Sequence, residues 1–211
     1  VKLIYNGFIK PKKEIGISSD NLKKKLGIKK NTFVFLVLAN LIPYKNHKLV
    51  IEAVDSLRKI VKKEFKVIFL GSGKDAYKKF LKNLIKEKKI EKYFIFKNKT
   101  KNIQTFLQIT NVGISSSLEE GLSNSLIEFI SEGITTIATN VGGNSEITNN
   151  RNGFLIENNN KKQLTKAMEV LLYDRKLLKN KSIESKKDSK KFNLGQMVKN
   201  HTILYKKIIN S

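Results

Sequence analysis

Two acidic residues eight positions apart, Glu120 and Glu128, lie in the segment EEGLSNSLIEFISEG at residues 119–133. They flank the expected start of a helix, whose first backbone N–H groups lack partners within the helix and attract anions. Ser123 has the residue type and position expected of the helix N-cap. The backbone of residues 121–124 is therefore a candidate anion site, with one carboxylate beside it and the other on the helix.

Each glutamate also has an ordinary structural interpretation. Helical spacing puts Glu128 near Asn124 and Ser131, opposite the apolar arc of Leu126, Ile127, Phe129 and Ile130, where it would decorate a solvated face. A carboxylate just before a helix, like that of Glu120, stabilises the helix N-terminus. Spacing alone therefore does not decide whether the two glutamates are functional carboxylates or ordinary surface residues.

Short apolar runs rich in β-branched and aromatic residues alternate with segments of helical periodicity. The runs cover residues 33–39, 66–71, 93–97, 111–117, 135–140 and 153–156. The helical segments cover residues 47–63, 75–89, 102–109 and 124–132. This alternation predicts an α/β fold: a Rossmann-like, doubly wound parallel sheet of about six strands, buried on both faces by helices.

The two ends of the chain give weaker patterns. KLIY at residues 2–5 is strand-like, and a small helix ends at Gly27. Residues 158–172 predict a covering helix that is capped by asparagine. SIESKKDSKKF at 182–192 indicates a linker or a solvated helix. A last helix within 195–209 is expected to dock through its apolar positions Met197, Ile203, Leu204 and Ile208.

A doubly wound sheet binds ligands at the carboxyl ends of the strands where the strand order reverses. If the six runs are the strands, the first and the fourth flank this point. Their following loops are ANLIPYKNH at 39–47 and SSLEEGLSN at 116–124, and we expect them to face each other. Topology therefore predicts that Lys45 lies close to the Glu120 loop, although local motifs do not connect the two residues.

The net charge of +24 comes from 42 basic and 18 acidic residues, and only Arg58, Arg151 and Arg175 are arginine. That leaves 42 − 3 = 39 lysines spread along the chain. Nucleic-acid-reading surfaces favour arginine, so nucleic acid is an unlikely partner. A solvated lysine-rich surface is the simplest interpretation, and peripheral contact with an anionic membrane surface is the alternative.

Several classes of site lack the residues that they need. There is no cysteine and there are only two histidines, His47 and His201, so we expect no metal site. GSGK at 71–74 lacks the spacer and the Ser or Thr of a nucleotide-triphosphate loop. No apolar run approaches the length of a membrane span. His47 is expected to begin a helix, and VGGN at 141–144 indicates a turn.

The order of these motifs resembles the C-terminal, donor-binding half of GT-B retaining glycosyltransferases of family 4, the glycosyl transferases group 1. The signature of that family is carried here by Glu120, Glu128, Gly133, Ile137, Gly142-Gly143 and Asn152-Gly153. ANLIPYKNHKLVIEAV resembles the diphosphate loop, and VIFLGSGKDAY the second strand and its turn. YNGF at 5–8 resembles the hinge entry, and FNLGQMVKNHTILY the closing helix.

The resemblance implies roles for individual residues. Lys45 would contact the donor diphosphate, Glu120 would approach the hydroxyls of the transferred sugar, and Glu128 would bind the ribose. The backbone of Gly121, Leu122, Ser123 and Asn124 would face the phosphate and the sugar, and Asn40 would lie beside the diphosphate. Lys45 and Glu120 are thus the implied catalytic residues, and the implied chemistry uses no metal or cofactor.

The sequence departs from the family pattern at two positions of this implied site. Asn40 stands where the family often has arginine, which puts more of the diphosphate binding on Lys45. Ser123 replaces a proline of the family loop and should still cap the helix.

The resemblance further implies three parts of the chain: a hinge segment at 1–10, a donor-binding domain at 11–190 and a closing helix at 191–211. The acceptor, a glycan or a lipid-linked sugar, would be held by an N-terminal domain that this sequence does not contain. The implied function is to transfer a sugar from a UDP- or GDP-sugar in cell-surface polysaccharide synthesis, with the isolated domain inactive. We expect a cytoplasmic protein, either free or at the inner face of the plasma membrane.

Three alternatives remain open from the sequence. The chain could be a non-catalytic subunit that binds nucleotide-sugars and needs a separate acceptor-binding chain. It could be a GT-B epimerase, although that chemistry calls for more acids and histidines in the crevice. It could also be a basic nucleic-acid-binding domain, which would show strongly salt-dependent binding.

Overall fold

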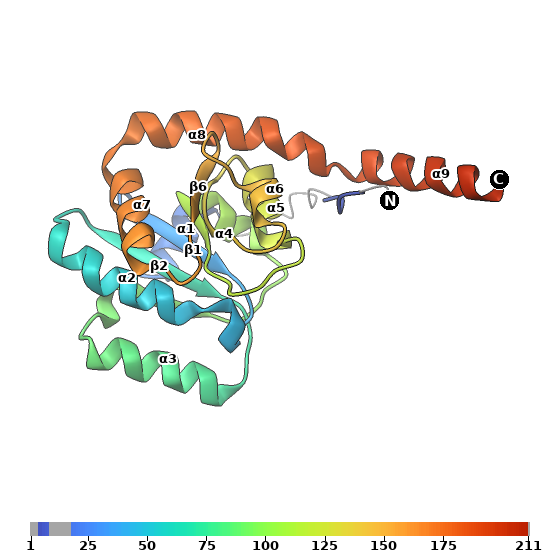
Figure 1. Cartoon of the computed structure of the whole chain (residues 1–211). Coiled ribbons are helices and arrows are strands. Elements are labelled where there is room, and N and C mark those ends of the chain that lie inside the picture. Colours follow the sequence, from blue (N-terminus) through green and yellow to red (C-terminus); the bar gives the residue numbers. More distant parts are fainter. Residues whose placement is uncertain (1–3, 9–17, 211) are drawn as a thin grey trace.

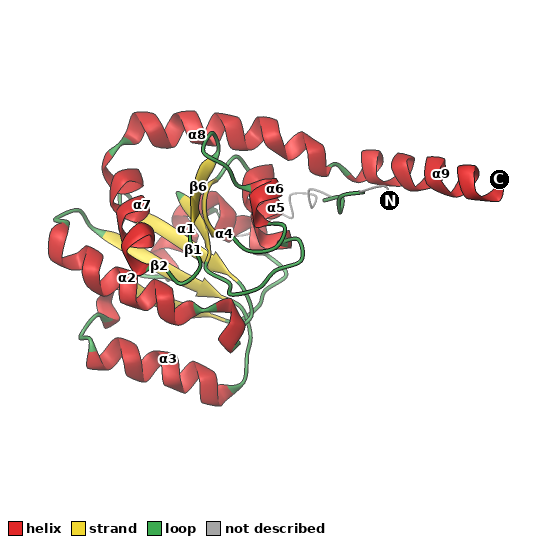
Figure 2. Cartoon of the chain, in the orientation of Figure 1, coloured by secondary structure: helices red, strands yellow, loops and turns green. Residues whose placement is uncertain are grey.

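The computed structural model describes residues 4–8 and 18–210 of the chain. Six strands form one parallel sheet in the order β3-β2-β1-β4-β5-β6. The strands are β1 (Phe33–Leu38), β2 (Phe65–Leu70), β3 (Phe94–Lys97), β4 (Val112–Ser115), β5 (Thr135–Thr139) and β6 (Gly153–Ile156). The predicted α/β fold, with a sheet surrounded by helices, is confirmed (Figure 2), and the strand order reverses between β1 and β4 as expected.

Helices cover both faces of this sheet (Figure 1). In the described part of the chain the α-helices are α1 (Ser19–Lys25), α2 (His47–Ile60), α3 (Asp75–Glu87), α4 (Ile103–Ile109), α5 (Asn124–Ser131), α6 (Asn144–Ile147), α7 (Lys161–Tyr173), α8 (Arg175–Asp188) and α9 (Leu194–Ile209). Short 3-10 turns are η1 (Pro43–Lys45), η2 (Glu91–Tyr93) and η3 (Ser189–Phe192).

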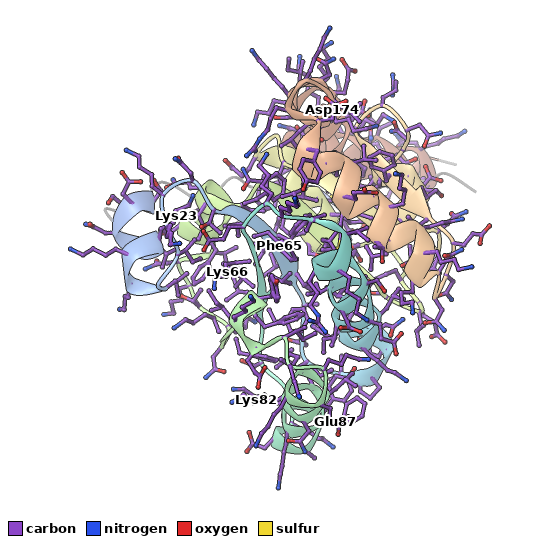
Figure 3. The ribbon with its side chains drawn as sticks, turned by 90° about the vertical axis from the view of Figure 1, so that its left-hand side faces the viewer. Lys23, Phe65, Lys66, Lys82, Glu87 and Asp174 are labelled. Atoms are coloured by element: carbon purple, nitrogen blue, oxygen red, sulfur yellow. The ribbon has the colours of Figure 1, made fainter. Side chains whose placement is uncertain are left out.

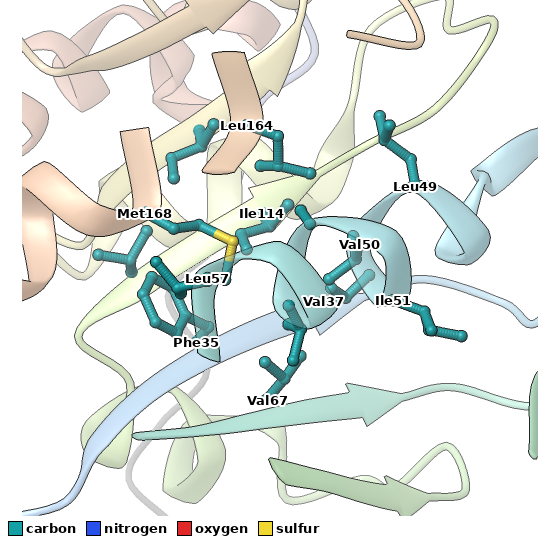
Figure 4. Packing of buried hydrophobic residues seen from close by; sticks show 14 of the residues in the cluster. Phe35, Val37, Leu49, Val50, Ile51, Leu57, Val67, Ile114, Leu164 and Met168 are labelled. Atoms are coloured by element: carbon teal, nitrogen blue, oxygen red, sulfur yellow. The ribbon is translucent and has the colours of Figure 1, made fainter. Parts of the chain in front are cut away.

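The side chains of β1 alternate between two hydrophobic cores, as the period of a strand requires. Phe35 and Val37 face the core made with α2, α3 and α7, while Val34 and Leu36 face the core made with α1, α4, α5 and α6. Figure 4 shows the first core from close by, with Met168 of α7 packed over the sheet. Both faces of the central strands are therefore buried.

β3 departs from the expected double burial. It lies at one edge of the sheet, and all four of its residues are only half-buried. An edge strand has one neighbouring strand instead of two, so its solvent side stays open.

The segment predicted as a linker or a solvated helix is the second half of α8, continued by η3. It is a helix that is solvated on one side only, because Lys186 and Lys187 are exposed whereas Ser185 and Asp188, and Lys181 just before the segment, are buried. The ammonium of Lys181 donates to the carbonyl oxygens of Asn150 (2.6 Å) and Gly153 (2.9 Å), while Arg151 forms an ion pair with Asp188. Polar residues can be buried when they have hydrogen-bond or ion-pair partners. In the sequence they then look the same as the polar residues of an exposed helix.

The last helix also differs from expectation. α9 forms where it was predicted, but none of its described side chains is buried, and the helix projects from the body of the molecule (Figure 1). Val198 and Ile203 are about half exposed, at 51% and 47%. Within the part of the chain that the structure describes, the apolar side of this helix is therefore not covered, and its docking stays a prediction.

The chain before α1 is only partly described. The predicted strand KLIY and the following basic loop lie largely outside the described residues. Phe8 forms an isolated parallel bridge with Asn193, and the ring of Tyr5 packs edge-on against that of Phe192. Residues 5–8 therefore lie beside the segment that leads into α9.

Lysine side chains are spread over the surface. Figure 3 shows Lys23, Lys66 and Lys82 on one side of the molecule, and these residues belong to α1, β2 and α3. The positive charge on this side thus comes from several separate elements.

Candidate donor-binding site

A cavity of about 360 Å³ opens at the carboxyl ends of β1, β2 and β4, on the side of the sheet that carries α4 and α5. This is the position where ligands bind in doubly wound sheets. Of the residues predicted for the site, the cavity is lined by Asn40, Lys45, Glu120, Leu122, Ser123, Asn124 and Glu128. Gly121, which is exposed, is not among the lining residues.

Lys45 and Glu120 form an ion pair at the edge of this cavity. The distance from Lys45 Nζ to Glu120 Oε1 is 2.7 Å, and the two side chains are 18% and 11% exposed. The residues are 75 positions apart, so the predicted proximity of Lys45 to the Glu120 loop is confirmed. Partial burial makes such a pair stronger than one on the open surface.

The turn η1 aims Lys45 at the cavity. Pro43 begins this turn, and Asn46 ends it in the left-handed conformation, with φ of 49°. The side chain of Asn46 then accepts a bond from the N–H of Leu49 and caps α2 (3.4 Å). The chain therefore reverses sharply after Lys45, because Asn is among the few residue types that adopt this conformation readily.

The loop after β4 is tied to the loop after β1. The N–H of Leu118 donates to the carbonyl oxygen of Tyr44 (2.8 Å), and Ser116 Oγ donates to that of Lys45 (3.0 Å). These bonds cross the reversal point of the sheet and fix the two loops relative to each other. The ion pair is consequently built on two backbones that cannot shift independently.

The Gly142-Gly143 pair holds the Glu120 loop from its other side. The N–H of Gly143 donates to the carbonyl oxygen of Gly121 at 2.7 Å. Gly142 has φ of 49°, and a Cβ at this position would lie 1.6 Å from the carbonyl oxygen of Glu120. The predicted turn is thus also a close backbone contact that only glycine permits.

The start of α5 faces the cavity, but the expected cap differs in detail. Ser123 is the N-cap residue and has an extended backbone, yet its side chain makes no capping hydrogen bond. Its Oγ lies 3.1 Å from Ser125 Oγ instead. The backbone N–H groups of the first turn are therefore left without this side-chain partner, as an anion site requires.

Glu128 is half-buried in the cavity wall and does not lie on a solvated face. Burial removes water from its carboxyl group and raises the pKa of Glu128 above its usual value. The interpretation as surface decoration, which spacing alone suggested, is therefore wrong. Helical spacing locates the side of α5 that meets the core, but it does not show that the opposite side faces a cavity.

Sequence reasoning missed several residues that line the cavity. Gly71 follows β2, Lys99 and Thr100 follow β3, and Ile103 begins α4. All of them belong to loops at the same edge of the sheet, so the expected strand order contained a signal for them. The N–H of Lys99 donates to Ser72 Oγ (3.2 Å), which joins the two loops.

His47 lies directly behind the Lys45 turn. Its ring is completely buried and packs edge-on against the rings of Phe69 and Tyr77. Burial, together with the nearby charge of Lys45, lowers the pKa of His47 to about 4. His47 begins α2 as predicted, and it does so as a neutral core residue.

Among the described residues, no three His, Cys, Asp or Glu side chains gather as a metal-binding cluster. The same part of the chain has no helix that is both long enough and apolar enough to cross a membrane.

A family model confirms part of the relationship that the motifs suggested, namely membership of the glycosyl transferases group 1. The model of the glycosyl transferases group 1 matches residues 18–188, which include the whole sheet and every residue that lines the cavity. The chain belongs to the glycosyl transferases group 1.

Two curated relatives illustrate the similarity of this chain to known proteins. Protein CapJ of Staphylococcus aureus is 27% identical over 199 residues, which cover 92% of this chain and 49% of CapJ. The UDP-Gal:alpha-D-GlcNAc-diphosphoundecaprenol alpha-1,3-galactosyltransferase of Escherichia coli is 29% identical over 182 residues, covering 84% of this chain and 46% of that enzyme. The chain spans about half the length of these curated relatives.

A solved GT-B structure shows the same fold. Anabaena HepE, crystallised in complex with UDP, superposes with a TM-score of 0.87 at 20% identity and covers 98% of this chain and 57% of HepE. The group 1 chain described here therefore has the fold of a C-terminal GT-B domain.

Proposed function

We propose that this chain is the donor-binding part of a retaining glycosyltransferase that uses a UDP-sugar. The observation that carries the proposal is the Lys45–Glu120 pair, which stands beside the start of α5 at the edge of the cavity. A cation and free helix N–H groups suit a diphosphate, and a carboxylate next to them suits sugar hydroxyls. The E. coli relative is named for UDP-galactose and HepE was crystallised with UDP, which supports uridine over guanosine.

Each predicted residue has a place in this proposal. Lys45 and the N–H groups at the start of α5 contact the diphosphate, with Asn40 beside them. Glu120 orients hydroxyls of the sugar, and Glu128 accepts the hydroxyls of the ribose. Ribose hydroxyls would supply hydrogen-bond donors to the desolvated carboxyl group of Glu128, which lowers the cost of its burial.

The proposed transfer breaks the bond between the anomeric carbon and the β-phosphate oxygen, and the electron pair stays on the phosphate. The acceptor hydroxyl oxygen bonds to the anomeric carbon on the face that the phosphate leaves, and its proton passes to the departing phosphate. Negative charge thus grows on the diphosphate during the reaction. Lys45 and the dipole of α5 stabilise that charge.

Acceptor binding is proposed to come from a separate N-terminal domain of the kind that closes over a donor. The isolated chain would then bind the donor without transferring the sugar. The name of the E. coli relative contains diphosphoundecaprenol, which makes a lipid-linked acceptor the first candidate. The lysine-rich surface would favour peripheral contact with an anionic membrane.

Titration of the chain with UDP and GDP in a calorimeter tests the proposal. We expect Lys45→Ala to weaken UDP binding at least about tenfold, because a hydrogen bond to a charged group contributes roughly 1.5–3 kcal/mol. Lys48→Ala is the matched control, since Lys48 is half exposed and faces Glu52 on α2. Unchanged affinity in Lys45→Ala would remove Lys45 from the site, and a folded chain that binds neither nucleotide would refute the function.

A further inference from the structure

Two consecutive buried serines after β4 hold the two members of the ion pair. Ser116 is 1% exposed, and its Oγ donates to the carbonyl oxygens of Lys45 (3.0 Å) and Asn46 (3.1 Å). Ser117 is 2% exposed, and its Oγ donates to Glu120 Oε1 (2.7 Å). Successive side chains of an extended segment point to opposite sides, so one serine serves the Lys45 loop and the other serves Glu120.

Ser117 and Lys45 donate to the same carboxylate oxygen. Glu120 Oε1 accepts from Lys45 Nζ at 2.7 Å and from Ser117 Oγ at 2.7 Å. One carboxylate oxygen can accept two hydrogen bonds. The two donors differ in mobility, because lysine has a long flexible side chain, whereas the Ser117 side chain is short and buried.

The backbone of Ser117 is anchored without help from Lys45. Its carbonyl oxygen accepts from Thr139 Oγ1 (2.6 Å) at the end of β5. The next residue, Leu118, donates through its N–H to the carbonyl oxygen of Tyr44 (2.8 Å). The position of the Ser117 hydroxyl is therefore set by the sheet and the neighbouring loop.

A donor diphosphate competes with Glu120 for the ammonium of Lys45. In the proposed function it carries two negative charges against the one of the carboxylate, so it would attract the ammonium of Lys45 more strongly than Glu120 does. Glu120 would then have a weaker hold on its cationic partner at the step at which it must face the sugar. Of its two donors, the Ser117 hydroxyl is the one that can stay.

We propose that Ser117 is a positioning residue, whose hydroxyl keeps the Glu120 carboxylate oriented toward the sugar after Lys45 has passed to the diphosphate. This inference rests on the proposed donor-binding function. Ser116 has a different task, because its hydroxyl fixes the main chain of Lys45. The two serines therefore separate the sugar contact from the diphosphate contact.

Binding measurements on single variants test this separation. The affinities of UDP, UDP-glucose, UDP-galactose and UDP-N-acetylglucosamine are measured by calorimetry, and the affinity of the best sugar nucleotide is divided by that of UDP. We expect Ser117→Ala to leave UDP affinity within about twofold and to lower this ratio about 3- to 10-fold, the usual effect of one lost hydrogen bond. Ser116→Ala should weaken UDP and the sugar nucleotide by the same factor.

Two further variants guard against a purely structural effect. Ser117→Cys fills nearly the same volume with a weaker donor, so it should lower the ratio even if the alanine variant folds poorly. Ser185→Ala is the matched control, because Ser185 is fully buried and donates to the carbonyl oxygen of Asn152 (3.0 Å) away from the cavity. It should change thermal stability and leave both affinities unaltered.

The outcomes distinguish this inference from the function on which it rests. If Ser117→Ala and Ser117→Cys keep the ratio of the unaltered chain, or weaken UDP as much as the sugar nucleotide, the positioning role is overturned while UDP binding still supports the proposed function. If the unaltered chain binds neither UDP nor any sugar nucleotide, the proposed function fails and the inference fails with it.

Discussion

The cavity has two differently constructed sides, each with one carboxylate. On the loop side, Glu120 is held by Lys45 and Ser117, and Gly142 packs directly on its main chain. On the helix side, Glu128 is half-buried in α5, and desolvation raises its pKa. The same residue type thus occupies two opposite electrostatic environments within one cavity.

The protein itself supplies hydrogen-bond partners for the carboxylate of Glu120, whereas the carboxyl group of Glu128 is desolvated, which costs free energy. On the loop side the chain itself supplies the partners of the Glu120 carboxylate before a ligand arrives, and the short, buried Ser117 side chain is the partner suited to keep its geometry during a reaction. The helix side keeps a carboxyl group short of water, so any ligand hydroxyl that reaches it relieves that cost. Stability and binding should therefore respond differently on the two sides.

Gly142→Ala should break the loop side and produce the largest effect. A methyl group there meets the carbonyl oxygen of Glu120 at 1.6 Å, so the loop must move. We expect a loss of about 3 kcal/mol or more in the free energy of unfolding and at least tenfold weaker UDP binding.

The matched control for Gly142→Ala is Gly27→Ala. Gly27 also has a positive φ, of 65°, but no atom lies within 4 Å of an added Cβ. This variant should cost only about 1–2 kcal/mol for the left-handed backbone and should bind UDP normally. Equal losses in the two variants, measured by denaturant unfolding, would show that the contact with the Glu120 loop is unimportant.

His47, behind the loop side of the cavity, should make the stability of the folded chain depend on pH. Because the pKa of His47 falls from 6.5 to about 4 in the folded chain, the unfolded chain takes up the proton more readily. Stability is therefore complete above pH 6.5 and is lost as the pH falls toward 4, by about (6.5 − 4) × 1.36, or roughly 3 kcal/mol. His47→Leu should remove this part of the pH dependence.

Urea unfolding of the unaltered chain and of His47→Leu, between pH 7.5 and pH 4.5, measures the effect. The difference between the two chains isolates His47 from the carboxylates that titrate in the same range. We expect the variant to gain stability relative to the unaltered chain as the pH falls. A difference that stays constant with pH would mean that His47 titrates normally.

Glu128→Gln tests the helix side of the cavity, and of the three substitutions it should have the smallest effect on stability. Because the pKa of Glu128 is raised in the folded chain, the unfolded chain ionises first, and stability falls as the pH rises above the usual value of 4.5. Glutamine cannot ionise, so the variant should be more stable at pH 7 by about 1 kcal/mol, a typical cost of a poorly compensated buried polar group. It should gain little at pH 4.

UDP binding by Glu128→Gln should weaken although the chain becomes more stable, because the proposed ribose contact would lose its charge. Glu119→Gln is the control, since Glu119 is an exposed carboxylate in the same segment and should change neither quantity. Thermal unfolding at pH 4 and pH 7 measures the stability of the variant, and calorimetry measures its affinity for UDP. Equal destabilisation of Glu128→Gln at both pH values would contradict the hypothesis that burial of the ionised carboxylate destabilises the folded chain.

The sequence predicted the framework of the site better than its details. The six strands and the meeting of Lys45 with the Glu120 loop followed from apolar runs and from the general rule for strand order. Strand patterns carry this information because both faces of the central strands are buried and leave near-continuous apolar runs.

What sequence reasoning missed depends on contacts that spacing does not encode. The serine run after β4 was interpreted as the end of a strand, although Ser116 and Ser117 bond to the two residues of the pair. Helical spacing puts Glu128 on a solvated face, because it contains no information about the cavity that this residue lines. Asp188 lies in a segment that resembles an exposed helix, because its ion pair with Arg151 is formed only in three dimensions.

The Lys45–Glu120 pair also has a consequence for the order of folding. It joins positions 75 residues apart, across the parallel pairing of β1 with β4, and such distant contacts are among the last that a chain can form. No fragment or partly folded chain that lacks either strand can assemble the pair. Donor binding would therefore require that β1 and β4 have already paired. A nucleotide added during refolding should bind and stabilise only molecules in which the sheet has formed.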